Sequence, residues 1–262
     1  MVLLIMAAGA LATFLALEGI LELSQEAGFV RENYRGERIP FCGGLAVILG
    51  SFFGGIVGLF FGFYDESQLS LLSITLFGFG LLGLLDDVGG DHSAKGLRGH
   101  ARALMEGRLT TGALKALYGG LLSLTLAYLL GGGLILNGLI IALTTNGLNL
   151  MDLRPGRCGK VFVLGLLVVL LVARDSRLEI FVPVAAAMMV YLPWDLGAKV
   201  MLGDMGSNPL GALLGVGFVI AGGGLWLLVG LVVVHWYAEK YSISRLVEGS
   251  RLLRFLDKLG QS

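Results

Sequence analysis

Long apolar runs separated by short polar segments dominate this chain. The run from Leu69 to Leu85 contains no charged residue and ends at Asp86-Asp87, and the run from Gly131 to Gly147 leads into Asn149-Leu-Met-Asp152. Such runs predict membrane-spanning helices, although several are shorter than the ~20 residues of a straight crossing. The pattern predicts about nine transmembrane helices, at residues 2–21, 43–63, 69–86, 112–130, 132–147, 161–173, 178–193, 206–221 and 224–238.

The composition agrees with this pattern. Hydrophobic residues make up 56% of the chain, and the mean hydropathy is +0.84. The chain also contains 42 glycines, which disfavour helices in water but allow close helix packing in lipid. We therefore expect an all-α fold, a polytopic membrane helix bundle. The formal net charge of zero gives no support to nucleic-acid binding.

The basic residues predict an orientation in the membrane. If the N-terminus lies outside, all of the 19 lysines and arginines except Arg174 and Arg177 fall on the inner side. This distribution follows the positive-inside rule. The same orientation places all of the acidic motifs on one side, at Asp86-Asp87, Asp152 and Asp204. We therefore expect a multi-pass protein of the cell membrane with its active site facing the cytoplasm.

The last residues differ from the rest of the chain. Residues 1–240 are predicted to form the transmembrane domain, and residues 241–262 a cytoplasmic, amphipathic, basic tail. From Ser242 to Leu259, apolar residues occur among basic ones at a spacing that suits an amphipathic helix. Two interpretations remain open: the helix lies on an anionic inner leaflet, or it packs against the cytoplasmic face of the bundle.

The first acidic motif is Gly83-Leu-Leu-Asp86-Asp87. Adjacent residues on a helix point about 100° apart, so the two carboxylates cannot simply face one ion together. One can bind Mg²⁺ while the other meets a phosphate or a proton, because Mg²⁺ takes one or two carboxylates, waters and phosphate oxygens. The alternative is a solvated, polar helix end.

The second motif runs from Asn146 to Arg157. Its Asn and Asp side chains can hydrogen-bond a sugar or a phosphate-bound ion, and Arg154 and Arg157 can bind pyrophosphate oxygens. The segment is not a Walker A loop, because Gly156-Arg-Cys-Gly-Lys160 lacks the first glycine at the right spacing and the following Ser or Thr.

The third motif is Gly203-Asp204-Met-Gly-Ser207. Small residues open a helix after an aspartate, so backbone N–H groups at the helix start can hold an anion while Asp204 binds a metal ion. The alternative is that Asp204 caps an ordinary transmembrane helix.

Four segments in register resemble one enzyme family. The segment from Asn33 to Leu45 resembles the first cytoplasmic loop of the polyprenyl-phosphate N-acetylhexosamine-1-phosphate transferases (the MraY and WecA family). The three acidic motifs are similar to that family's paired-aspartate, Asn-Ala-x-Asn-Leu-x-Asp and Met-Gly-Asp-x-Gly-Ser motifs. The resemblance covers about residues 1–238 and implies an MraY-like fold.

The resemblance also implies a reaction. A membrane polyprenyl phosphate attacks a nucleotide amino sugar, expected to be a UDP-sugar, and yields a polyprenyl-diphospho-sugar with Mg²⁺ as cofactor. Cell-wall or cell-surface glycan synthesis is the expected setting, and a homodimer is an open expectation. The implied catalytic residues are Asp86, Asp87 and Asp152; the metal ligands are Asp204 and Asp87; and the substrate-binding residues are Asn146, Asn149, Lys95, Arg154, Arg157 and Ser207.

Two departures from the family pattern leave alternatives open. The family's second aspartate after the Asn motif is replaced here by Pro155, and its His-rich loop has no counterpart. One interpretation is an active transferase with altered donor specificity. The other is a catalytically silent relative that binds polyprenyl phosphate or a cell-wall partner. A transporter is disfavoured because the spans are almost free of charge.

Overall fold

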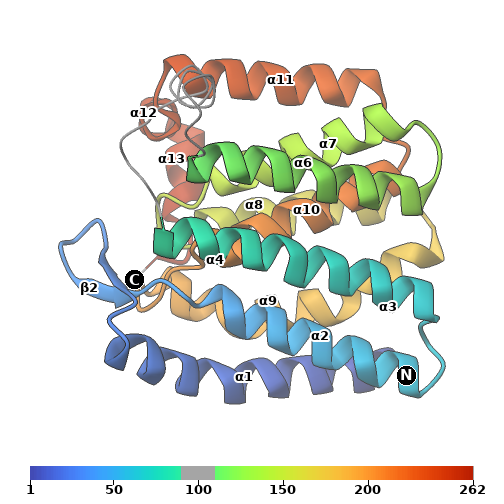
Figure 1. Ribbon diagram of the computed structural model, residues 1–262. Coiled ribbons are helices and arrows are strands. Elements are labelled where there is room, and N and C mark those ends of the chain that lie inside the picture. The colour runs from blue at the N-terminus through green and yellow to red at the C-terminus, as the bar shows by residue number, and fades with distance from the viewer. Residues whose placement is uncertain (90–109, 262) are drawn as a thin grey trace.

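The protein is an all-α membrane helix bundle. The computed structural model describes residues 1–89 and 110–261, and within these residues every predicted span coincides with a helical segment. The segments lie side by side and roughly parallel (Figure 1). They are α1 (Val2–Glu26), α2 (Gly44–Phe60), α3 (Glu66–Ser73) continued by the π-helical turn η1 (Ile74–Gly78) and α4 (Phe79–Gly89), α6 (Thr111–Leu130), α7 (Leu134–Asn149), α8 (Arg157–Val172), the 3₁₀ turn η2 (Ser176–Ile180) continued by α9 (Phe181–Leu196), α10 (Asp204–Ile220) and α11 (Leu225–Lys240).

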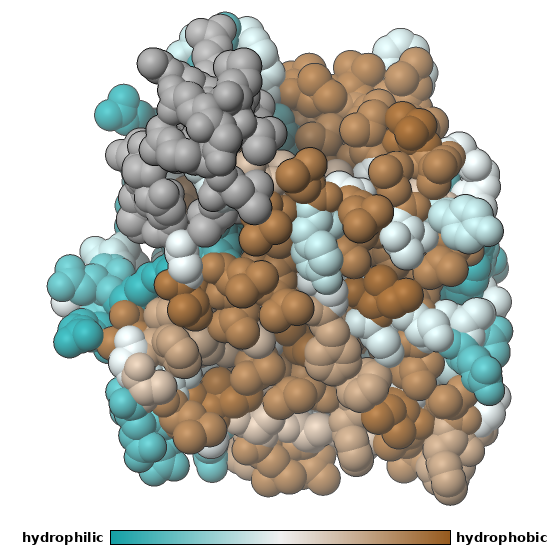
Figure 2. All heavy atoms as spheres, in the orientation of Figure 1, coloured by the Kyte–Doolittle hydropathy of each residue, from teal (hydrophilic) through white to brown (hydrophobic). Residues whose placement is uncertain are grey.

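The outer surface has the character of a membrane protein. Four helical segments among the described residues are long and apolar enough to cross a membrane: Val2–Glu26, Glu66–Gly89, Gly112–Leu130 and Ser176–Leu196. Large apolar side chains such as Phe60, Leu171 and Trp226 are more than 80% exposed. Figure 2 shows apolar residues across the middle of one face and hydrophilic residues gathered toward the ends of the helices. An exposed apolar belt of this kind is expected where lipid surrounds a bundle.

Helix α10 forms the centre of the bundle. Its residues from Met205 to Gly217 are all buried, and it packs against α2, α4, α7 and α8. Helix α11 is the opposite case, because it has no buried residue and contacts α7 at the periphery. The acidic start of α10 is therefore placed among the ends of its neighbours.

One end of the bundle carries a small polar addition that the apolar pattern does not predict. Strands β1 (Val30–Glu32) and β2 (Arg38–Pro40) form an antiparallel hairpin with Arg31 opposite Ile39. The turn is closed by the side chain of Asn33, which accepts hydrogen bonds from the backbone N–H groups of Arg35 and Glu37 at 2.8 and 3.0 Å. The hairpin, the α4 end and the tail helices lie at the same end (Figure 1).

The tail forms two short helices, α12 (Ile243–Gly249) and α13 (Arg251–Lys258). They contact the first turn of α8, where Arg157 and Lys160 donate to Asp257, so the tail packs against this end of the bundle. Helix α8 also begins at Arg157, earlier than the predicted span at residue 161. Its first turn is polar, and the tail supplies partners for Arg157 and Lys160.

Candidate active site

Two carboxylates from different helices meet one ammonium group at the hairpin end of the bundle. Asp86 lies near the end of α4, and Asp204 is the first residue of α10. The Nζ of Lys115, on the first turns of α6, donates to the Oδ2 of Asp86 at 2.9 Å and to the Oδ2 of Asp204. All three side chains are partly exposed, at 20 to 26%. We call Asp86, Lys115 and Asp204 the carboxylate cluster; it is polar and reachable from outside the protein.

Asp87 faces away from this cluster, as the 100° separation of neighbouring helical residues predicts. Its carboxylate is 1% exposed and accepts a hydrogen bond from the backbone N–H of Met205 at 3.1 Å. The guanidinium of Arg31 lies 3.2 Å from its other oxygen and donates to its backbone carbonyl at 2.7 Å. Asp87 therefore joins the hairpin to the start of α10.

This arrangement changes how α10 begins. Gly203 occupies the N-cap position, and no side chain of that position caps the helix. Asp204 does not cap the helix either, because its carboxylate faces Lys115. The N-terminal N–H groups of a helix favour an anion, and at Met205 that anion is the carboxylate of Asp87. Asp204 is thereby left available for chemistry.

Glycine at two positions allows these elements to meet. A Cβ on Gly83 would lie 2.1 Å from the carbonyl oxygen of Asp204, so α4 approaches the start of α10 backbone to backbone. Gly203 has a φ of +68°, and a Cβ there would lie 2.3 Å from the carbonyl oxygen of Phe41. A side chain at either position would separate the elements that carry the cluster.

The second motif contributes an amide and a hydroxyl to the same place. Asn149, the last residue of α7, donates from Nδ2 to the Oδ2 of Asp204 at 3.2 Å and accepts from the buried hydroxyl of Ser207 at 2.8 Å. These bonds fix the orientation of the Asn149 amide beside the cluster. Asn149 and Ser207, both predicted to bind substrate, are therefore adjacent to Asp204.

Asp152 lies in the turn after α7. Removal of its carboxyl group from water, together with the nearby carboxylates of Asp195 and Asp204, raises the pKa of Asp152 well above its usual value. The backbone N–H of Gly203 hydrogen-bonds the carboxyl group and opposes this shift. Asp152 thus belongs to the same acidic region as the cluster.

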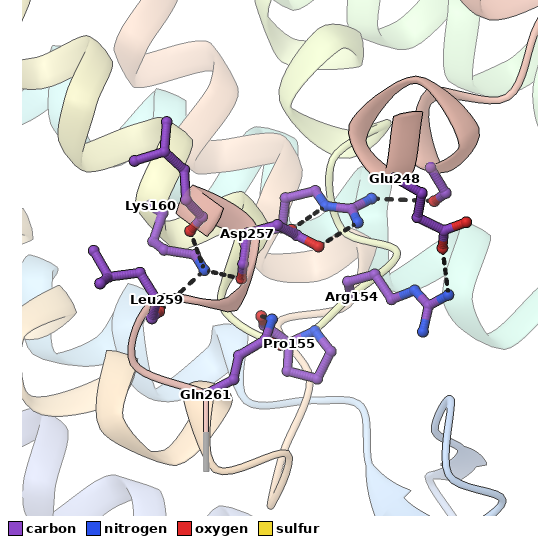
Figure 3. Close-up of polar contacts among 10 residues, drawn as sticks. Arg154, Pro155, Lys160, Glu248, Asp257, Leu259 and Gln261 are labelled. Carbon is purple, nitrogen blue, oxygen red and sulfur yellow. Dashed lines mark hydrogen bonds and ion pairs between the residues drawn. The ribbon is translucent and has the colours of Figure 1, made fainter. Parts of the chain in front are cut away.

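The remaining predicted residues lie elsewhere. Arg157 is 4% exposed and donates to Asp257 at 2.7 and 2.9 Å and to Ser244 at 3.1 Å, so its guanidinium is engaged by the tail. Arg154 pairs with Glu248 at 3.3 Å. Figure 3 shows the contact of Arg154 with Glu248 and, beside it, the polar contacts of Asp257. Their substrate-binding role stays a prediction.

Two further residues, Asn146 and Lys95, were also predicted to bind substrate and are not part of the carboxylate cluster. Asn146 is exposed on α7, one turn before Asn149. Lys95, expected to neutralise phosphate charge, lies outside the described residues.

Two site residues are missing from the sequence-based prediction, Lys115 and Arg31. Lys115 falls near the start of a predicted span, and a single cation in an apolar run of α6 is a recognisable signal, because ionisable residues at membrane spans are costly and usually paired. Arg31 lies in a loop with several other arginines, and its selection depends on the register of the hairpin.

The cluster provides a test of whether Mg²⁺ fits this protein. Among the described residues, no group of three or more His, Cys, Asp or Glu side chains is arranged for a metal ion. The carboxylates of Asp86 and Asp204 nevertheless converge on one cation, the Lys115 ammonium. A divalent cation in the place of this ammonium would have its charge balanced by the same two carboxylates. Mg²⁺ is commonly bound by one or two carboxylates together with waters and substrate phosphates. The donor set therefore fits Mg²⁺ through Asp86 and Asp204; Asp87, the other predicted ligand, faces Met205 instead.

Comparison with known families identifies a matching family model. A family model described as glycosyl transferase family 4 matches residues 69–222, more than half of the 262 residues. The match contains the carboxylate cluster, Asn149, Asp152 and Ser207, whereas Arg31 and the tail lie outside it. No curated protein matches the chain.

Proposed function

The chain belongs to glycosyl transferase family 4, and we propose that it transfers a sugar-1-phosphate from a nucleotide amino sugar to a membrane polyprenyl phosphate. The observation that carries the proposal is the meeting of Asp86, Lys115 and Asp204 at one end of a membrane bundle. Phosphoryl transfer requires mainly positioning and neutralisation of charge. A charged cluster at the end of apolar helices can receive a water-soluble donor and a lipid-borne phosphate together.

The reaction forms one phosphorus–oxygen bond and breaks another. An oxygen of the lipid phosphate attacks the sugar-bearing phosphorus of the donor. The bond from that phosphorus to the bridging oxygen breaks, and the nucleoside monophosphate leaves with the bond's electron pair. The products are the lipid diphospho-sugar and the nucleoside monophosphate.

The chain's own residues have separate roles in this proposal. Lys115 releases one of its carboxylate partners and binds a phosphate oxygen instead, so its charge balances that of the substrates. Asp86 and Asp204 would hold Mg²⁺, which supplies charge neutralisation at the diphosphate when bound. Asp87 positions the start of α10 through Met205. Asp152, with its raised pKa, can hold a proton near the reacting phosphates.

The donor is expected to lie toward the Asn149 side of the cluster. Asn149 and Ser207 hydrogen-bond each other beside Asp204 and can bind sugar or phosphate oxygens. Replacement of the family's second aspartate by Pro155 removes an acceptor for a base, whereas Arg154 offers donors for phosphate. We expect weaker selectivity among nucleotides than the family pattern implies.

The orientation in the membrane is part of the proposal, because the donor is a cytoplasmic metabolite. It can be tested with single cysteines at exposed positions on opposite ends, Glu32→Cys on the hairpin and Glu66→Cys at the start of α3. Both native cysteines are buried, so the unmodified chain is the control. Labelling of Glu66→Cys, but not of Glu32→Cys, by an impermeant thiol reagent in intact cells supports a cytoplasmic site; the reverse pattern overturns it.

The activity itself is tested with purified protein, Mg²⁺, polyprenyl phosphate and a panel of nucleotide sugars. Release of nucleoside monophosphate that depends on both the lipid and Mg²⁺ supports the transferase. Binding of polyprenyl phosphate without release from any donor would instead favour the catalytically silent relative.

A further inference from the structure

A second polar site lies beside the tail, apart from the carboxylate cluster. A pocket of about 700 Å³ opens between the β1–β2 turn, the Arg154-Pro155 segment and helices α12 and α13. Its volume is within the range of small-molecule sites. None of Asp86, Lys115 and Asp204 lines this pocket.

The pocket wall carries an excess of positive charge. Among the described residues, four cationic side chains line it: Arg35, Arg154, Arg254 and Lys258. Two carboxylates from the described part of the chain also line it, but each is already paired with a cation. Glu248 pairs with Arg154 at 3.3 Å. Asp257 accepts two hydrogen bonds from the buried guanidinium of Arg157, which does not itself line the pocket. Such a concave cationic surface attracts anions.

An aromatic ring orders two of the guanidinium groups. Those of Arg35 and Arg154 each lie 5.2 Å from the centroid of the Tyr34 ring. Cation–π contacts of this kind restrict the arginine side chains. Planar guanidinium groups held in place are well suited to bidentate recognition of phosphate.

The tail is fixed to the loop so that its own cations complete the wall. Lys160 donates to the carbonyl oxygens of Leu256 at 3.0 Å and Leu259 at 3.2 Å, and to that of Asp257, at the end of α13. Gln261 donates to the carbonyl oxygen of Pro155 at 2.9 Å. Figure 3 shows these contacts converging on the last turn of the tail.

Arg254 and Lys258 share one face of α13. Residues four apart on a helix are neighbours on its surface. Both side chains line the pocket together with Arg154, and the guanidinium of Arg254 also donates to the backbone carbonyl oxygen of Glu248.

We propose that this pocket binds a diphosphate group, with Arg254 and Lys258 of the tail as phosphate-binding residues. The same chemistry could come from a nucleotide or from an anionic lipid headgroup. The assignment of a nucleotide as its source rests on the proposed function; the binding of diphosphate does not. The tail then forms a diphosphate-binding site of its own, separate from the reaction centre at the carboxylate cluster.

The test measures binding of inorganic pyrophosphate to the purified full chain by calorimetry, without lipid acceptor. The double variant Arg254→Gln/Lys258→Gln is expected to bind about tenfold or more weakly, because it loses two charge-assisted contacts. Arg251→Gln is the matched control, since Arg251 is an exposed cation of the same helix that does not line the pocket. It is expected to bind as the unmodified chain does.

A further variant guards against loss of folding. The charge-preserving pair Arg254→Lys/Lys258→Arg should retain pyrophosphate binding. Equal affinity in the unmodified chain and the glutamine pair, equal weakening in Arg251→Gln, or loss of binding in the charge-preserving pair would each overturn the proposal.

Competition identifies the source of the diphosphate. Displacement of pyrophosphate by UDP assigns the pocket to a nucleotide, and displacement by anionic rather than neutral lipid in nanodiscs assigns it to a headgroup. Because this assay involves no turnover, its failure is separate from a failure to release nucleoside monophosphate.

Discussion

The carboxylate of Asp87 accepts a hydrogen bond from the backbone N–H of Met205 at 3.1 Å. An acid at the end of one transmembrane segment thus caps the start of another. The contact satisfies a donor that the first turn of a helix leaves unpaired, and it places negative charge at the positive end of α10. It also explains how two adjacent aspartates take different roles, since Asp86 faces Lys115 and Asp204.

Removal of this acceptor should destabilise the protein. Asp87→Leu leaves the buried N–H of Met205 unsatisfied, at a cost of about 1–3 kcal/mol. Asp87→Asn keeps an acceptor oxygen but loses the charge that pairs with Arg31, so a smaller loss is expected. Thermal unfolding in detergent should rank the unmodified chain above Asp87→Asn and Asp87→Leu lowest. Equal unfolding temperatures for all three would show that the contact does not support the fold.

The close approach at Gly83 gives a second stability prediction. A Cβ there meets the carbonyl oxygen of Asp204 at 2.1 Å and the backbone nitrogen of Met205 at 2.5 Å, and backbone atoms cannot rotate away. Gly83→Ala should therefore cost at least about 1–3 kcal/mol, as other overpacked positions do. The control is Gly120→Ala on α6, where nothing lies within 4 Å of the added Cβ.

Gly120→Ala should be neutral or stabilising by up to ~1 kcal/mol, because alanine is the better helix former. If Gly83→Ala unfolds at the same temperature as Gly120→Ala, then α4 and α10 do not approach as closely as described.

Lys115 is expected to compete with a metal ion for Asp86 and Asp204. Lys115→Met removes the competing charge, and a unit charge at about 4 Å contributes on the order of 4 kcal/mol at an effective dielectric of 20. Binding of Mn²⁺, measured by electron paramagnetic resonance, should tighten by about tenfold or more. Sugar-phosphate transfer should fall at the same time, because the substrates lose a cationic partner.

The control for this substitution is Lys240→Met, which removes a lysine that stacks on Trp236 far along the chain from the cluster. Unchanged or weaker Mn²⁺ binding in Lys115→Met would mean that the ammonium and the metal do not share ligands.

Docking of the tail should depend on pH. The hydrogen bonds from Arg157 hold the pKa of Asp257 below its usual value. A depressed folded-state pKa contributes stability above the unfolded pKa of about 4, and this contribution disappears as the pH falls through the folded value. Hydrogen exchange of backbone amides 251–258, corrected for intrinsic rates, should therefore accelerate on acidification below about pH 4.

The comparison for the pH experiment is Asp257→Asn, whose exchange should be faster at neutral pH and should show little further change on acidification. Protection of the tail in the unmodified chain that persists throughout this range would exclude the Arg157–Asp257 pair as its anchor.

The positions of the helices could be predicted because each span is an apolar run bounded by polar or glycine-rich segments. The grouping of Asp86, Asp152 and Asp204 could be predicted for the same reason, since motifs at the same side of a membrane can meet. The ends of the helices were predicted less accurately. Helix α8 begins at Arg157 because tail residues from far along the chain pair with the polar side chains of its first turn.

The rest of the site depends on tertiary contacts that no local pattern contains. Lys115 is part of the site only because it contacts Asp86 and Asp204, which are distant from it in sequence. The hairpin is short, and its Arg31 is selected by register among several arginines. The engagement of Arg157 by Asp257 likewise requires knowledge of where the tail docks.

The reaction centre is tested most directly by release of nucleoside monophosphate from a nucleotide amino sugar in the presence of polyprenyl phosphate and Mg²⁺. Asp204→Asn preserves the shape of the side chain and removes its charge, so release should fall by about 10²-fold or more while the protein still unfolds cooperatively. Asp86→Asn should be similarly severe, and the double variant little worse than either single one, because the two carboxylates act on one cation. Full activity in Asp204→Asn would contradict a reaction centre at Asp86, Lys115 and Asp204.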